Sequence, residues 1–348
     1  MNQVLDGLDL ASLEAEAQSE VLFPGGLRET ISQLALGQLT LDFDQTLQLL
    51  ASRFLSALKG SAWRLTRLAA PAALWGVLCR LHRQGSEAGR MVCLLMVCAF
   101  LSADLNDHAA LCLESVERMS GGMQGLFPLL LTALSAVGGS AGSALMQPAV
   151  VASAGAMVNL IRHVTLPLCV CFAVLTMLCH LGGGLKLNHL CALSHRAANW
   201  TLGVGFTVFI GVMATRGFAA SAVDGVALRT AKYALDNFVP VVGGLFADTV
   251  DTLIGSGLLV QGALGITGLL LLCGWCLSPL CQTFASALIY KLAAALLQPF
   301  ADGDLTDCIH DFSQVLMLLF VIQLCAAAMY LLLIGQIVGL GSATMMLR

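Results

Sequence analysis

Three long stretches of this sequence carry no charged residue, and they constrain the fold more than any other feature. They lie between Arg118 and Arg162, between Asp251 and Lys291, and between Asp311 and Arg348. Each is longer than the ~20 residues that a helix needs to cross the ~30 Å hydrocarbon core of a bilayer. Apolar residues make up 58% of the chain and charged residues only 11%, whereas soluble domains carry roughly a quarter charged residues. The sequence therefore predicts an all-α, polytopic membrane protein.

The predicted membrane segments number about seven to nine and include broken or re-entrant helices. Continuous spans are expected at about residues 60–81, 88–106, 164–182, 198–216, 263–290 and 312–336. In the first of these, the Arg64 side chain would have to extend to the membrane interface. The apolar stretch over residues 121–161 is interrupted instead, which favours two short helices in a hairpin or re-entrant pair. The interrupting residues are Pro128, Gly138, Gly139 and Pro148.

Two further segments are predicted to be amphipathic. Residues 1–58 are expected to form an acidic N-terminal arm, and residues 59–348 the helical transmembrane domain. The first twenty residues lack a basic start and an apolar core, so no signal peptide is expected there, while a missing upstream leader stays an open alternative. The span at about residues 88–106 ends in an acidic connector that is expected to form a surface helix, and its acids are Asp104, Asp107, Glu114 and Glu117.

A charged block lies beside strongly apolar sequence at residues 222–254. On a helix, Arg229, Lys232 and Asp236 share one face because they are three and four residues apart. Asp224, eight residues before Lys232, falls on nearly the same side. Two interpretations stay open: a charged strip that lines a subunit interface or aqueous vestibule, and a solvated helix that lies on the membrane surface.

Asp248 and Asp251 follow in the same block with apolar sequence on both sides. A charge near the bilayer centre costs roughly 2.5 to 3.5 kcal/mol on insertion scales, so such acids need a cation or water nearby. The alternatives are a cation or proton site, and a charge partner for Arg229 or Lys232. Two acids alone are weak evidence for a metal, and no metal site is predicted.

Small residues at regular spacing predict one helix-packing surface. Gly262, Gly265 and Gly268 recur every three residues, which lets a second helix approach closely. Cys273 and Cys276 have the spacing of a dithiol motif, but they lie inside an apolar helix, where a reactive thiolate is disfavoured. No redox role is therefore expected.

Signatures of enzymes and of nucleic-acid binding are missing from the sequence. It has no His-Glu-x-x-His, Gly-x-Ser-x-Gly or Gly-x-x-x-x-Gly-Lys-Ser/Thr motif, and no basic stripe interleaved with aromatic residues. We therefore expect no catalytic residues, no cofactor and no nucleic-acid partner. Any energy coupling would need a separate ATPase.

Several short motifs resemble the stage III sporulation protein AE family. They are Asp224-Gly225, Leu228-Arg229-Thr230-Ala231-Lys232, Asn237-Phe238-Val239-Pro240-Val241-Val242-Gly243, Asp248-Thr249-Val250-Asp251-Thr252, Tyr290-Lys291-Leu292-Ala293-Ala294-Ala295-Leu296-Leu297-Gln298-Pro299 and Thr344-Met345-Met346-Leu347-Arg348. Order and spacing agree over about residues 120–348. The chain departs from the family at Gln261-Gly262, where members commonly have Lys-Asn. The candidate functional or assembly residues are Asp224, Arg229, Lys232, Asp236, Pro240, Gly243, Asp248, Asp251, Tyr290, Lys291 and Pro299.

The resemblance implies a role in sporulation rather than in catalysis. It implies an integral membrane component of a secretion-like channel complex between mother cell and forespore, needed for late forespore development. The expected location is the mother cell membrane around the forespore. The expected partners are the other proteins of the stage III sporulation operon, a forespore membrane protein, further copies of the chain and the lipid bilayer. A small-molecule permease that feeds the forespore stays as the alternative.

Overall fold

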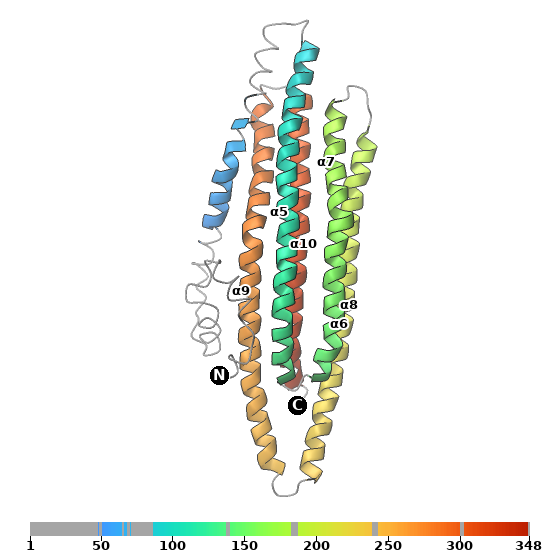
Figure 1. The fold of residues 1–348 in the computed structure, drawn as a ribbon, viewed down its shortest axis with the longest axis vertical. Helices are drawn as coiled ribbons and strands as arrows, with labels where there is room; N and C mark the ends of the chain where they lie inside the picture. Colours follow the sequence, from blue (N-terminus) through green and yellow to red (C-terminus); the bar gives the residue numbers. More distant parts are fainter. Residues whose placement is uncertain are drawn as a thin grey trace.

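The computed structural model describes the backbone of residues 48, 51–64, 66–67, 70, 86–136, 140–181, 187–238, 243–299 and 303–346. For residues 231–260 this description covers the backbone alone. All of the secondary structure in these ranges is helical (Figure 1). The predicted all-α class is therefore confirmed.

Long helices pack side by side into an elongated bundle (Figure 1). They are α5 (Ser86–Ala136), α6 (Ser140–Leu160), the π-helix η1 (Ile161–Thr165), α7 (Leu166–Leu181), α8 (Asn188–Phe238), α9 (Gly243–Leu297) and α10 (Gly303–Met346). α6, η1 and α7 follow one another without a break, so they form one rod. α10 lies between α9 on one side and the α7–α8 pair on the other, and the helix of residues 51–64 lies along α9.

Within the described residues, five helices are long and apolar enough to cross a membrane. The apolar segments are Met91–Ala133, Val150–Leu181, His189–Gly217, Gln261–Leu297 and Gly303–Gly339. Many large apolar side chains on the outside of the bundle are exposed, including those of Leu95 and Val208, as expected of helices that face lipid. The chain is thus a helical membrane protein. The seven to nine segments and the N-terminal arm are not confirmed, and most of residues 1–58 lie outside the described part.

The predicted helix breaks at prolines are absent. Pro128 lies inside α5 and Pro148 inside α6. A proline removes one backbone hydrogen bond, and neighbouring helices and local backbone adjustment can compensate for this loss in a membrane bundle. α5 and α6 run in opposite directions (Figure 1), so the hairpin falls after Ala136. Gly138 and Gly139 belong to this connection but lie outside the described residues.

The predicted boundary at Arg162 is also wrong. This residue was expected between two spans, whereas η1 carries the helix through it from α6 into α7. The five-residue π-helix changes the hydrogen-bond pattern locally, and the rod continues through it. The Arg162 guanidinium forms an ion pair with Glu117 of the neighbouring helix α5, with Nη1 2.9 Å from Oε1. A charge in an apolar sequence therefore marks a side contact here and not a turn.

The three predicted packing glycines differ in their surroundings. A Cβ at Gly265 would lie 2.1 Å from Cγ2 of Val338, so this glycine allows the close approach of α9 and α10. A Cβ at Gly268 would lie 3.5 Å from Leu126 of α5, which is ordinary contact. Gly262 has nothing within 4 Å of that position. Close packing at this surface is therefore concentrated at Gly265.

Candidate functional site

A buried carboxylate is the centre of a polar site in the described bundle. Asp104 of α5 is only 6% exposed. The hydroxyl of Tyr290 on α9 donates a hydrogen bond to its Oδ2, and Nε of Arg64 lies 3.4 Å from the same oxygen. A buried charge is tolerated only when it is paired and hydrogen-bonded. Three separate helices therefore meet at this carboxylate.

The Arg64 guanidinium links Asp104 to two further side chains. Its Nη1 donates to Oγ of Ser286 at 2.5 Å and contacts Nε2 of His108. An arginine can only donate, so Nε2 accepts and the ring proton lies on Nδ1. His108 is 2% exposed and its Nδ1 has no hydrogen-bond partner. The site thus holds a neutral histidine whose proton is not hydrogen-bonded. We call Arg64, Asp104, His108, Ser286 and Tyr290 the polar cluster.

Local sequence places these side chains together. Asp104 and His108 are four residues apart on α5, and Ser286 and Tyr290 are four apart on α9, so each pair lies on one helix face. On the third side, the helix of residues 51–64 packs against α9, where Phe54 contacts Phe284 with ring centroids 5.9 Å apart. Ser61 and Ser286 also share a hydrogen bond of 3.1 Å.

A polar pocket of about 360 Å³ adjoins the polar cluster. It lies between residues 51–64 and α9, and its polar lining includes Arg53, Ser56, Ser61, Arg64, Gln282 and Ser286. Two guanidinium groups and several hydroxyls can hold a small polar or anionic group through charge-assisted hydrogen bonds. Among the described residues, no group of three or more His, Cys, Asp or Glu side chains could hold a metal ion.

A second polar contact joins α7 to α10. Nε2 of His180 lies 3.1 Å from Oδ2 of Asp311, and both side chains are partly accessible. Asp311 lies on the third turn of α10. A partly exposed pair of this kind contributes about 1 kcal/mol. It fastens two helices and does not form a separate site.

The predicted charged block lies far from the polar cluster. Asp224, Arg229, Lys232 and Asp236 fall on the last turns of α8, and Gly243, Asp248 and Asp251 on the first turns of α9. Their side chains, and the whole of Pro240, lie outside the described part. These ends of α8 and α9 extend beyond the ends of α5 and α10 (Figure 1). Along α9, Asp251 and Tyr290 are roughly 58 Å apart at 1.5 Å per residue. We call residues 218–238 and 243–260 the charged hairpin.

The remaining candidates from the sequence have different surroundings. Tyr290 is buried in the polar cluster, while Lys291 is exposed beside it and Pro299 is exposed just after α9. The sequence interpretation missed Arg64, Asp104, His108 and Ser286.

Two of these residues were assigned to the wrong environment. Arg64 was expected to extend to the membrane interface, but it turns inward to Asp104. In the acidic connector, Asp107, Glu114 and Glu117 are exposed as expected, and only Asp104 is buried. The available signal was the spacing of four residues between an acid and a histidine in apolar sequence.

Comparison with known proteins agrees with the motifs. A family model described as Stage III sporulation protein AE matches residues 26–341. The Stage III sporulation protein AE of Bacillus subtilis (strain 168) is 32% identical over 235 residues, which is 68% of this chain and 59% of that protein. The match therefore spans less than two thirds of the relative's length. No solved structure matches the chain.

Proposed function

Because this chain belongs to the stage III sporulation protein AE family, we propose that it is a structural component of a secretion-like channel complex between mother cell and forespore. The chain is a sporulation membrane protein with five candidate membrane-spanning helices in its described part. In the proposal it lies in the mother cell membrane around the forespore and supports late forespore development. It needs no catalytic residue for this role. Further membrane segments, such as one near residues 60–81, belong to the same proposal.

The charged hairpin is the observation that carries the proposal. α8 and α9 contain 51 and 55 residues, so each is roughly 77 to 83 Å long, more than twice the ~30 Å hydrocarbon core. Their joined ends therefore extend out of the apolar layer, and they carry acids and bases on consecutive turns. A charged hairpin of this length suits contact with other proteins, namely further copies of the chain, the other operon proteins and a forespore membrane partner.

The polar cluster favours a second candidate, a small-molecule permease. A buried carboxylate, a neutral histidine and a polar pocket are the groups with which transporters bind solutes or move protons. In this role the chain would work as a monomer or dimer. The charged hairpin would then be dispensable for activity.

The mass of the detergent-solubilised particle tests the first proposal. We expect a large complex when the full chain is produced with its operon partners, and loss of that complex for Arg229→Ala or Lys232→Ala. Arg196→Ala is the matched control, because this arginine is exposed on α8 but lies outside the charged hairpin. The pair exchange Lys232→Asp with Asp236→Lys should recover part of the assembly if these two residues pair across one helix turn.

The same variants separate the two candidates. A channel component should lose sporulation efficiency and complex mass together in the hairpin variants. If the chain is a permease, the hairpin variants should keep their sporulation efficiency and their particle mass, which should be that of a monomer or dimer. Asp104→Asn should then lose solute uptake into vesicles. A small particle that is indifferent to Arg229→Ala and Lys232→Ala would reject the channel proposal.

A further inference from the structure

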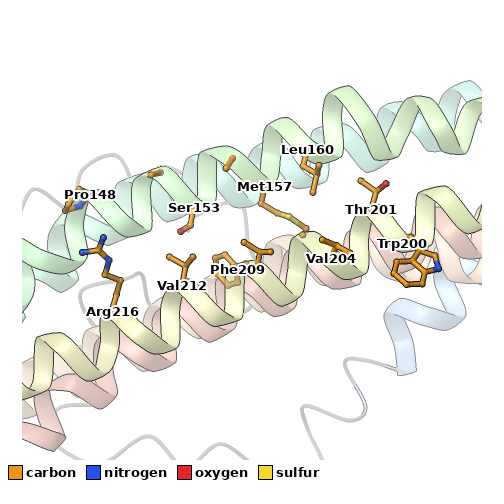
Figure 2. Close-up of a pocket in the computed structure, with 14 residues that line it drawn as sticks. Pro148, Ser153, Met157, Leu160, Trp200, Thr201, Val204, Phe209, Val212 and Arg216 are labelled. Atoms are coloured by element: carbon orange, nitrogen blue, oxygen red, sulfur yellow. The ribbon is translucent and has the colours of Figure 1, made fainter.

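A groove of about 900 Å³ runs between α6 and α8 (Figure 2). Apolar side chains form most of its lining, and Val204 and Val208 are more than half exposed on its α8 side. At its base, Gly205 lets the two helices approach, because a Cβ there would lie 2.4 Å from Cδ2 of Leu160. Both walls belong to apolar segments that are long enough to cross a membrane. The groove is therefore open to the hydrocarbon region and not to a polar solute.

One charged side chain lines this groove, that of Arg216 on α8. Figure 2 shows it at one end, where it extends toward Pro148 of α6, while Trp200 lies toward the other end. Arg216 is exposed, and the ion pairs among the described side chains all involve other residues. It is the first charged residue after the uncharged stretch of residues 197–215, which is about as long as one membrane span. A cation at such an end lies at the depth of lipid headgroups.

The length of the groove fits one lipid chain. Arg216 and Val204 are twelve residues apart on α8, which is roughly 18 Å along the helix. One leaflet contributes about half of the ~30 Å hydrocarbon core, or roughly 15 Å. An acyl chain that starts at Arg216 would therefore end near Val204, beside Met157 of α6.

We propose that this groove binds one anionic phospholipid, with its phosphate on the Arg216 guanidinium and an acyl chain along α6 and α8. The planar guanidinium of arginine can donate two parallel hydrogen bonds to one phosphate group. The groove lining contains no Asp or Glu that could hold the cationic headgroup of a zwitterionic lipid. A second protein helix of apolar character would leave Arg216 without a counter-charge.

Native mass spectrometry of the full chain in detergent, titrated with phosphatidylglycerol or phosphatidylcholine, tests the proposal. We expect tighter binding of phosphatidylglycerol. Arg216→Gln should weaken this binding about tenfold, because glutamine can replace the two charge-assisted hydrogen bonds by at most one neutral hydrogen bond, and it should leave phosphatidylcholine binding unchanged. Arg216→Lys should be intermediate because the charge remains without the planar fork. Arg196→Gln is the matched control, since Arg196 is exposed on the same helix but does not line the groove.

A second variant tests the groove itself. Ala156 lines it on α6 and is exposed, so Ala156→Trp should fill it and weaken the binding of both lipids while helical circular dichroism stays unchanged. Equal losses in Arg196→Gln and Arg216→Gln would show general charge attraction and overturn the proposal. Unchanged lipid binding in Ala156→Trp would overturn it too. If Ala156→Trp lowers the mass of a protein oligomer and not the number of bound lipids, the occupant is a second copy of the chain and the proposal is wrong.

Discussion

Loss of Arg64 should destabilise the bundle because it leaves the Asp104 carboxylate buried without its cation. At the 3.4 Å that separates Nε from Oδ2, Coulomb's law with an effective dielectric constant of about 20 gives roughly 5 kcal/mol. The Arg64 side chain is 23% exposed, so solvent screening lowers this value to about 3 kcal/mol. We therefore expect Arg64→Leu to lower the free energy of unfolding by about 3 kcal/mol.

A double-mutant cycle separates the ion pair from the other contacts of Arg64. Asp104→Asn removes the charge but keeps an acceptor for Tyr290, so it should cost less than Arg64→Leu. In the double variant no unpaired carboxylate remains, and the total loss should fall well below the sum of the two single losses. The expected interaction energy is about 2 to 3 kcal/mol, typical of contacting groups in one hydrogen-bond network.

Unfolding in mixed micelles of mild detergent and sodium dodecyl sulfate measures these free energies. Loss of helical circular dichroism at 222 nm follows the transition, and Lys291→Ala serves as the exposed control, with an expected change of about 0.5 kcal/mol or less. Additive single losses, or an Arg64→Leu loss no larger than that of the control, would refute the pairing of Arg64 with Asp104. The helix of residues 51–64 would then not contribute to the site.

Three further contacts give predictions for the same assay or for thiol labelling. Gly265→Ala should lower the free energy of unfolding by about 1 to 3 kcal/mol through overpacking against α10, whereas Gly262→Ala, which meets no neighbour, should not; equal effects would contradict the close approach. Cys179 and Cys191, with sulfurs 3.2 Å apart, should lose maleimide labelling together after mild oxidation by copper phenanthroline and regain it with a reductant; independent labelling would contradict their contact. Glu117→Gln breaks an exposed ion pair to η1 and should cost about 0.5 kcal/mol or less; a loss above 2 kcal/mol would contradict a solvent-screened pair.

Uncharged stretches of sequence were enough to predict the helical membrane class. The stretch from Asp251 to Lys291 carries no charge and became most of α9. In lipid, the backbone N–H and C=O groups must hydrogen-bond to one another, and few backbone structures allow this. An apolar segment of sufficient length therefore specifies a helix almost by itself. Residues 224–236, for which the shared face of Arg229 and Lys232 was argued, are also helical.

The positions of helix ends and the burial of polar side chains depend on contacts with other helices, which the local sequence does not indicate. Pro128 was expected to end a helix, but α5 continues because its neighbours compensate for one lost hydrogen bond. Asp104 and Glu117 belong to one acidic segment, yet only Asp104 meets a guanidinium and a phenol on other helices. Side-chain periodicity identifies a helix face, and it cannot identify which distant residue will cover that face.

The length of α9 has a mechanical consequence. The helix is continuous from Gly243 to Leu297 with Pro279 inside it, so its charged tip and Tyr290 belong to one long helix. With roughly 58 Å between Asp251 and Tyr290 at 1.5 Å per residue, a tilt of about 5° at the buried end displaces the tip by about 5 Å. That displacement equals about one helix turn. A tilt of α9 by this angle at the polar cluster would therefore move the charged hairpin far enough to exchange one set of neighbours for the next.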